Sequence, residues 1–325
     1  MFSLWLVKDT YKVNILPMVS SISWSGNVDT LGLQLDFEIC YDKYLLSSKN
    51  NFVIAIGDTI ALLYSDNGKG VQIFRGKVTS QVKNKDLMRS FTCFDNAFYL
   101  NKSKEVIQFK NITAKQAIEK LLDKYSIPHN ICNIGVSIKK IYSDKTVSDI
   151  IKDILSIASA SNGKKYNLCM KNNKLTIEEY KSRVLDATQL PLYDLSIETS
   201  IEEMANRIIV HNSSEKSLTV YAKVEDKASI KKYGLIQHTE KIDKDEKKTA
   251  STVAKSLLKQ KNVISETGSV KMKGNYKVEC GMLLKLYDAK YNINNYYVVT
   301  SANHKIDNNS YEMSLGLEVY RGWTG

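Results

Sequence analysis

Apolar and polar positions alternate through the first third of the chain. In residues 31–40, "LGLQLDFEIC", every odd position is apolar and the even positions carry Gly, Gln, Asp, Glu and Cys. This period of two predicts a strand with one buried face. Residues 57–80 predict two more strands around a polar loop, and residues 88–94, "MRSFTCF", predict another. Short strands separated by Gly, Asn, Asp and Ser predict a barrel or a sandwich over residues 1–105.

The period changes from two to 3.6 after residue 105. Residues 111–128, "NITAKQAIEKLLDKYSIP", predict an amphipathic helix. Thr113 and Gln116 have the spacing of a capping box at its start, and Pro128 ends it. The apolar face of this helix carries Ala114, Ala117, Ile118, Leu121, Leu122 and Tyr125.

A second helix of the same kind is predicted in residues 145–160. Thr146 and Asp149 have the capping-box spacing. The apolar stripe consists of Val147, Ile150, Ile151, Ile154 and Leu155. Two strands follow, "YNLCM" and "KLTIEEY", joined by a polar turn from Lys171 to Lys174. Residues 106–185 are therefore predicted to form an α/β module.

Strand patterns return from residue 186. Candidates are "ANRIIVHN", "SLTVYAKV", "VISETGSVKM" and "YEMSLGLEV", together with a hairpin in residues 281–301. One amphipathic helix is predicted at about residues 245–261, with Ala250, Val253, Ala254, Leu257 and Leu258 on one face. The predicted class is α+β, mainly β, with domains 1–105, 106–185 and 186–325.

One strand–loop–strand pattern occurs twice. Residues 57–80 and 281–301 both begin with Gly, continue through an apolar strand, cross a polar loop and end in Val-Thr-Ser. Aligning the glycines matches Ile60 with Leu284 and Leu62 with Leu286. Alternation predicts that these four side chains are buried in equivalent places. Because hairpins in any β-rich protein look alike, the residues alone leave duplication and coincidence both open.

Composition places the chain among folded soluble proteins. It has 325 residues, 43% of them hydrophobic and 25% charged, and this length predicts two or three domains. The net charge of +11 comes mostly from dispersed lysines, which favours a solvated surface over specific nucleic-acid readout. The N-terminus lacks the pattern of a signal peptide, and no apolar run is long enough to span a membrane. We therefore expect synthesis in the cytoplasm.

The residue types that carry chemistry are scattered. The sequence contains no Gly-x-Ser-x-Gly elbow, phosphate-binding loop, dinucleotide-binding glycine motif or His-Glu-x-x-His motif. The histidines are His129, His211, His238 and His304, and the cysteines are Cys40, Cys93, Cys132, Cys169 and Cys280. None of these has the spacing of a metal site, and we expect all five thiols to be reduced and structural.

Two weak catalytic candidates remain. A Cys/His hydrolase could be assembled in space from Cys93 or Cys280 with His304, but both cysteines lie in strand patterns. The adjacent carboxylates Glu178–Glu179 and Glu202–Glu203 would diverge on a strand or a helix. The sequence therefore predicts no enzyme activity and no catalytic, cofactor-binding or metal-binding residues.

Five segments together resemble a known family. They are "IGDTIALLY…VQIFRGKVTS", "FDNAFYLNKSKEVIQFKNITAKQAIEKLLDKYSIP", "SIEEMANRIIV", "DKASIKKYGLIQHTEKI" and "YYVVTSANHKIDNNSYEMSLGLEV". In this order they resemble the XkdQ/YqbQ-type baseplate hub proteins of contractile phage tails, defective prophages and phage-tail-like bacteriocins. These hubs are related to the late-control tail proteins and to the hub part of type VI secretion spikes. The expected Pro-Gly before the last hairpin is Cys280-Gly281 here.

The resemblance implies a structural role and a fold. It implies two β-barrel domains like those of a tail tube protein, with the α/β module inserted between them. Three chains would form a homotrimer whose six similar domains adapt a sixfold tail tube to a threefold spike. The implied partners are the tail tube protein, the central spike protein and the baseplate wedge proteins. The implied location is the baseplate of a virion or tail-like particle, assembled in the bacterial cytoplasm.

Two other classes of function stay open at the level of sequence. One is a tail hydrolase that degrades the cell wall through a site assembled from scattered residues. The other is a basic protein that binds nucleic acid. The structural hub predicts no cofactor, no specific nucleic-acid binding and no membrane partner.

Overall fold

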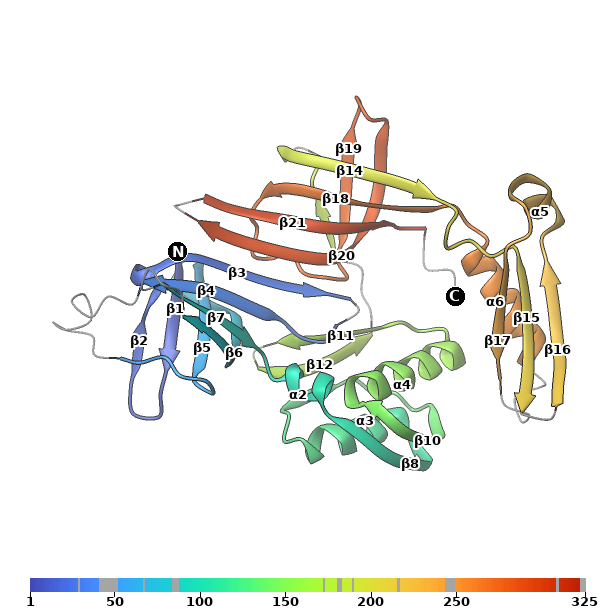
Figure 1. The fold of residues 1–325 in the computed structure, drawn as a ribbon, viewed down its shortest axis with the longest axis horizontal. Helices are drawn as coiled ribbons and strands as arrows, with labels where there is room; N and C mark the ends of the chain where they lie inside the picture. Colours follow the sequence, from blue (N-terminus) through green and yellow to red (C-terminus); the bar gives the residue numbers. More distant parts are fainter. Residues whose placement is uncertain are drawn as a thin grey trace. The chain divides into compact units, whose positions relative to one another are not determined.

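The computed structural model describes residues 1–28, 30–40, 52–66, 68–83, 88–171, 173–179, 183–188, 190–214, 217–242, 249–307 and 310–321 (Figure 1). By its contacts the chain divides into two compact units. The first consists of Met1–Leu195 with Ser269–Gly325, and the second is Ser196–Gly268. Among the described helices, none is long and apolar enough to cross a membrane. The three-domain division at residues 105 and 185 stays a prediction.

The N-terminal β region forms from strands with one buried face. Its elements are β1 (Phe2–Val7), β2 (Lys12–Asn14), the 3-10 turn η1 (Leu16–Met18), β3 (Val19–Asn27), β4 (Gln34–Cys40), β5 (Thr59–Asp66), β6 (Lys69–Lys83) and β7 (Met88–Phe94). In β4, Leu35, Phe37 and Ile39 are buried as the alternation predicts. They pack in one apolar core with residues of β1, β3, β5, β6 and β7.

One cysteine departs from its expected setting. Cys93 is buried in the core, as expected for a small apolar side chain. Cys40 is exposed. It occupies an even position of β4, so it points away from the face that carries Ile39. All five cysteines are free thiols.

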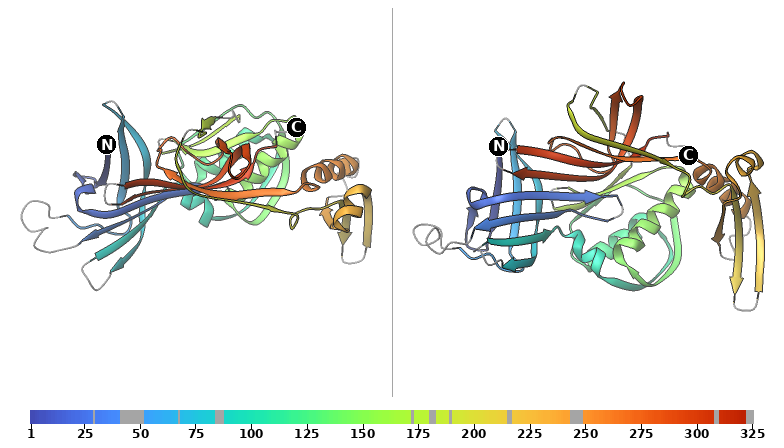
Figure 2. Two further views of the ribbon diagram at one scale, coloured as in Figure 1. Left: turned by 90° about the horizontal axis from the view of Figure 1, so that it is seen from above. Right: turned by 45° about the horizontal axis from the view of Figure 1, so that its top comes forward.

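The C-terminal β region joins the same sheet. Its strands are β13 (Val184–Asp186), β14 (Leu192–Ser200), β18 (Ser265–Lys273), β19 (Leu283–Asp288), β20 (Ile293–Asp307) and β21 (Ser310–Val319). Residues 196–200 of β14 and 265–268 of β18 belong to the second unit. The central order is β14-β18-β21-β20-β3-β4-β7-β6-β5-β1-β2, with β19 on β20 and β13 on β19. In Figure 2 the red strands β20 and β21 run beside the blue strands β3 and β4.

The mainly β, α+β class is confirmed, but the described strands form no closed barrel. The two β regions, expected as separate barrels, are continuous because β3 pairs with β20 from Ser21↔Asp307 to Asn27↔Ser301. Strand β3 is hydrogen-bonded to β4 on one side and to β20 on the other, so this strand has no free side on which the first β region could close into a barrel of its own. The physical consequence is one sheet running through both β regions.

The module between the β regions has its own apolar core. Its elements are α2 (Ala97–Lys102), β8 (Lys104–Thr113), α3 (Ala114–Lys124), β9 (His129–Ile131), β10 (Ser137–Thr146), α4 (Val147–Asn162), β11 (Tyr166–Lys171) and β12 (Lys174–Glu179). The capping box of Thr113 and Gln116 is present, and Thr146 accepts from the N–H of Asp149. Both predicted apolar faces are buried except at Tyr125, which is partly buried. Residue 172, in the predicted turn, lies outside the described residues.

This core extends beyond the predicted start of the module. Leu31, Ala97 and Leu100 are buried in the same cluster as the two helices. Ala97 and Leu100 belong to α2, which precedes residue 106. The sequence did not reveal α2 because a six-residue helix is too short to show a period.

The second compact unit consists of a small sheet and two helices. It contains β15 (Arg207–Ser214), β16 (Ser217–Glu225), α5 (Lys227–Tyr233), β17 (Gln237–Lys241) and α6 (Ala250–Lys261). The strand order is β16-β15-β17. Ala250 and Ala254 of α6 pack on Ile208 and Val210 of β15, so the predicted helix is confirmed from residue 250. Its predicted start at residues 245–248 lies outside the described residues.

Candidate functional site

The repeated pattern forms the same turn at both places. Gly57 has φ +90° and Gly281 has φ +82°, in the region that favours glycine. The Gly57 N–H donates to the carbonyl of Val78 at 2.8 Å, and the Gly281 N–H donates to the carbonyl of Val299 at 2.8 Å. Return bonds run from the Val78 N–H to Asp58 and from the Val299 N–H to Met282, both at 2.9 Å. The two glycines therefore close equivalent turns.

Register and bulges also coincide. In the first hairpin Lys77 lies opposite Thr59 on one side and Phe94 on the other. In the second, Val298 lies opposite Leu283 and Glu318. The register then shifts between Val78 and Ser80 in β6, and between Val299 and Ser301 in β20. A β-bulge is a positioned feature of a sheet, so its recurrence in the Val-Thr-Ser triplets supports duplication over coincidence.

The whole strand order is repeated. The first region has the order β3-β4-β7-β6-β5-β1, and the second has β14-β18-β21-β20-β19-β13. Strand by strand, β1, β3, β4, β5, β6 and β7 correspond to β13, β14, β18, β19, β20 and β21, which follow one another along the chain in the same sequence. The four residues predicted to be equivalent, Ile60, Leu62, Leu284 and Leu286, are all 0% exposed, which confirms that prediction. The two regions also differ. Strand β1 is antiparallel to β5, whereas β13 is parallel to β19, and the β5–β6 pair has a register shift between Leu62 and Leu63 that the β19–β20 pair lacks.

We expect Gly57→Ala and Gly281→Ala to carry similar costs. Each should lower the free energy of unfolding by about 1–2 kcal/mol, because a Cβ disfavours positive φ. A Cβ would meet no atom within 4 Å at Gly57, and at Gly281 it would make only an ordinary contact with Asn167 Oδ1 at 3.7 Å. Urea denaturation followed by circular dichroism checks this. Gly57→Asn and Gly281→Asn, which tolerate this conformation better, should cost less. A neutral Gly281→Ala beside a costly Gly57→Ala would contradict the equivalence of the turns.

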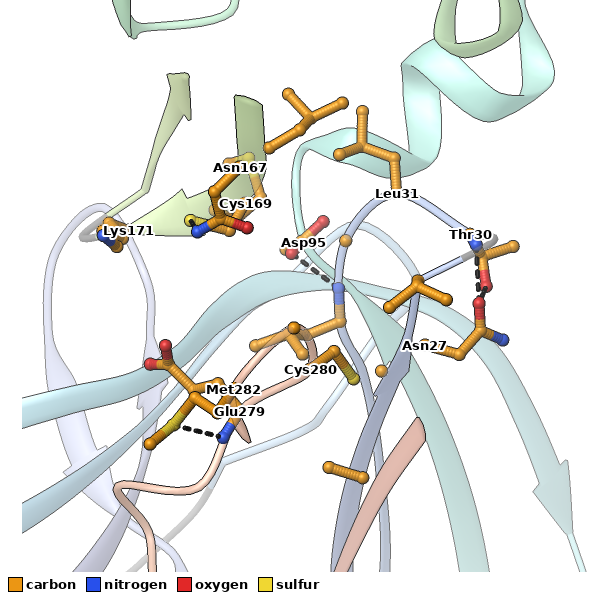
Figure 3. A pocket seen from close by; sticks show the side chains of 18 of the residues that line it. Asn27, Thr30, Leu31, Asp95, Asn167, Cys169, Lys171, Glu279, Cys280 and Met282 are labelled. Carbon is orange, nitrogen blue, oxygen red and sulfur yellow. Dashed lines mark hydrogen bonds between the residues drawn. The ribbon is translucent and has the colours of Figure 1, made fainter. Parts of the chain in front are cut away.

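A cavity of about 1140 Å³ lies in the first unit. Figure 3 shows Asn27 and Leu31 from the β3–β4 connection, Asn167 and Cys169 from β11, and Cys280 from the turn before β19. The cavity therefore brings together both β regions and the α/β module. Burial raises the pKa of both thiols, Cys169 and Cys280, to about 11. Both are protonated at neutral pH and are weak nucleophiles.

Asp95 is the buried carboxyl beside this cavity. Burial raises its pKa to about 6, against two backbone N–H donors that favour the charged form. Its Oδ2 accepts from the Leu33 N–H at 2.7 Å (Figure 3). Its Oδ1 accepts from the Ala97 N–H at 2.9 Å. These bonds tie the start of β4 to the start of α2. The carboxyl thus has a structural task, since both its oxygens accept from backbone groups.

His304 and Cys280 both line the cavity, but the imidazole ring of His304 makes its hydrogen bonds with other residues. His304 Nε2 lies 3.2 Å from the carbonyl of Val278, and Nδ1 lies 3.0 Å from the hydroxyl of Tyr311. Because a carbonyl only accepts, Nε2–H donates to it and Nδ1 accepts from Tyr311. The ring also stacks on Trp24, with centroids 4.8 Å apart. Neither nitrogen is left to deprotonate a thiol.

The other candidate catalytic residues, Cys93 and the two pairs of adjacent glutamates, do not form a site. Burial and the Asp36 carboxylate raise the pKa of Cys93 far above its usual value. Glu178 pairs with Lys171, and Glu179 pairs with Lys164, so these neighbours diverge as expected of a strand. Glu202 and Glu203 lie exposed in the turn after β14.

The remaining histidines have separate local surroundings. His129 Nδ1 lies 3.0 Å from the carbonyl of Ile127, and His238 Nε2 lies 3.4 Å from a Glu240 oxygen. His211 Nδ1 is buried without a hydrogen-bond partner among the described residues. Within that part of the chain, no three His, Cys, Asp or Glu residues gather closely enough to hold a metal ion. The expectation of no catalytic, cofactor or metal site stays a prediction.

Comparison with known proteins agrees with this fold. The model of the YQBQ-like family matches residues 22–318, and the chain belongs to that family. It is 24% identical to the phage-like element PBSX protein XkdQ of Bacillus subtilis, over 98% of this chain and 97% of that protein.

Solved structures share the fold at low identity. The 43 kDa tail protein of prophage MuSo2 from Shewanella oneidensis has a TM-score of 0.72 at 11% identity, covering 98% of both chains. The tail protein from Neisseria meningitidis MC58 has a TM-score of 0.69 at 14% identity, covering 98% of this chain and 96% of that one. Both cover nearly the full length, so they share the arrangement of both β regions.

Proposed function

We propose that this chain is a structural baseplate hub of a contractile phage tail or a phage-tail-like particle. It acts as a homotrimer that joins a sixfold tail tube to a threefold central spike and contacts the wedge proteins around it. It is assembled in the cytoplasm of the bacterial host and has no catalytic activity of its own. The observation that carries this proposal is the duplicated β unit, with its shared strand order, glycine turn and bulge.

Two similar β regions in one chain would allow a trimer to join a sixfold tube to a threefold spike. Three copies of a chain with two similar β units present six similar units around one axis. Such a ring matches a sixfold tube through its units and a threefold spike through its chains. A closed cyclic trimer also ends strand pairing without open fibres. The family and the tail proteins that share the fold support this class of function.

The alternatives have less support. A cell-wall hydrolase built on Cys280 and His304 would need a free ring nitrogen, and both nitrogens are engaged by Val278 and Tyr311. A nucleic-acid reader would need clustered cations, whereas many lysines here are paired with carboxylates. We expect no release of peptidoglycan fragments and only weak, steeply salt-dependent DNA binding.

The test is assembly of the full-length protein. Native mass spectrometry at increasing protein concentration should show trimers, with the monomer dominant at low concentration. Co-expression with the tail tube and spike proteins of the same particle should yield a ternary complex. Its negative-stain images should show sixfold features where the tube binds. A chain that stays monomeric at all concentrations and binds neither protein would overturn the proposal.

A further inference from the structure

The junction between the two β regions serves as a template for a second junction. Within the chain, the last part of β3 pairs with the second half of β20. The pairs are Trp24↔His304, Ser25↔Asn303, Gly26↔Ala302 and Asn27↔Ser301. This pairing occupies the side of β20 beyond the end of β19, while β21 pairs along the other side. One β region therefore binds the other through the part of β20 that follows the bulge.

The strands equivalent to this junction have edges with no strand partner in the part of the chain that the structure describes. Strand β6 corresponds to β20, and the Val-Thr-Ser alignment places Ser80–Lys83 at the position of Ser301–His304. Strand β5 pairs with β6 only as far as Lys77, and β7 occupies the other side of β6. The β5 side of Ser80–Lys83 thus has no strand partner among the described residues. Likewise, β14 corresponds to β3 and is a terminal strand of the sheet, with β18 as its neighbour.

We propose that β14 of one copy pairs with the end of β6 of a second copy and so repeats the β3–β20 junction between subunits. Strands β3 and β14 are both nine residues long, and aligned end to end they match Trp24–Asn27 with Ile197–Ser200. The intermolecular register is then Lys83↔Ile197, Val82↔Glu198, Gln81↔Thr199 and Ser80↔Ser200. Three such junctions, alternating with three internal ones, close a ring of six units. This inference rests on the proposed homotrimer and names the surface that forms it.

Side chains along the two edges are complementary. The Nε2 atom of Gln81 is buried and has no hydrogen-bond partner among the described residues, and this register brings the Thr199 hydroxyl opposite it. Val82 is 54% exposed, and a strand added at this edge would cover part of its side chain. A buried amide donor without a partner is costly. The second copy would satisfy one group and cover the other.

Charge favours the same partner. The segment from β14 to the following turn carries Asp194, Glu198, Glu202 and Glu203 and no basic residue. Strand β6 from Arg75 to Lys83 carries three basic residues and no acidic one. Opposite charge on the two edges steers β14 toward β6 of another copy. It also disfavours pairing of two β14 edges, which would place carboxylates together.

The test is a disulfide that forms only in the stated register. Val82→Cys and Glu198→Cys are combined in a Cys40→Ser background, because Cys40 is the exposed native thiol. Mild oxidation of the full-length protein at high concentration should give covalent dimers and a terminal covalent trimer on non-reducing gels. Each single-cysteine variant supplies only half of a heterologous contact, so it should give no trimer.

An off-register variant is the matched control. Val82→Cys with Tyr193→Cys places the second thiol on the same strand, five residues or about 17 Å away, and should not cross-link. A protein that forms trimers in native mass spectrometry without the Val82–Glu198 disulfide would overturn this junction and leave the hub proposal standing. Equal cross-linking of both pairs, or no oligomer and no cross-link, would overturn the junction as well.

Discussion

Gly76→Ala should destabilise the first β region by about 3 kcal/mol, near the upper end of the usual range for overpacking. Gly76 lies in β6 opposite Ile60 of β5. A Cβ there would lie 2.1 Å from the carbonyl oxygen of Phe94 and 2.6 Å from Cζ of Phe74. The first atom is backbone of β7, and the second belongs to a ring that is 2% exposed. Neither can move without separating strands of the sheet. Urea denaturation measured by circular dichroism should show the loss.

Gly70→Ala is the matched control for this effect. Gly70 lies in the same strand, and a Cβ there would meet only Leu63 Cδ2 at 3.9 Å, an ordinary contact. Its free energy of unfolding should change by no more than about 0.5 kcal/mol. Equal effects of the two substitutions would show that close packing at Gly76 does not limit the fold.

The second β region carries different residues at the positions equivalent to Gly76 and Phe74. The position equivalent to Gly76 is Tyr297, which is 0% exposed and lies opposite Leu284. The position equivalent to Phe74 is Asn295, opposite Leu286. A buried aromatic side chain thus stands opposite Leu62 in the first region, as Phe74, and opposite Leu284 in the second, as Tyr297. Such exchanges remove sequence identity between the halves and leave the strand order intact.

Local patterns predicted part of the local structure. Helices α3 and α4 show a 3.6-residue stripe and an N-terminal Thr, and both form as predicted. The two hairpins were predicted because each combines a turn glycine with alternating strands. Strand β14 was not predicted, although Leu192, Leu195 and Ile197 are its half-buried positions. Its acidic residues and its two pairs of adjacent exposed positions, Tyr193–Asp194 and Glu198–Thr199, hide the period of two.

The junction between the β regions could not be read from the sequence. Strands β3 and β20 meet through Ser, Asn, Gly and Ala pairs, with Trp24 stacked on His304. Strand pairing over such a separation leaves no periodic signal in either segment. The surroundings of the candidate catalytic residues could not be predicted from the sequence either. Cys280 and His304 do line one cavity, but only the structure shows that the ring nitrogens face Val278 and Tyr311.

His304 should make this junction sensitive to acid. Burial lowers its pKa from 6.5 to about 4. Between these values the unfolded chain binds a proton at His304 and the folded chain does not, so stability falls as the pH falls through this window. The contribution is complete above pH 6.5 and is lost toward pH 4. A shift of this size corresponds to roughly 3 kcal/mol, acting where Trp24 of β3 stacks on His304 of β20.

Asp95 acts in the opposite direction, so a variant must isolate the histidine. Burial raises the pKa of Asp95 from 3.8 to about 6, and its contribution to stability is therefore lost as the pH rises through that range. The measurement is the free energy of unfolding of wild type minus that of His304→Gln from pH 7.5 to 4.5. Asp95 is common to both proteins and cancels. We expect this difference to shrink by roughly 2–3 kcal/mol toward pH 4.5.

Tyr311→Phe provides the control for this pH dependence. It removes the hydroxyl that hydrogen-bonds to His304 Nδ1 but keeps the ring and the burial that lowers the histidine pKa. Its stability should be reduced at every pH, while most of the wild-type slope between pH 4.5 and 6.5 is retained. If wild type and His304→Gln instead ran parallel over this range, His304 would be accessible to water. The two β units would then not be held together by a dry Trp24–His304 contact.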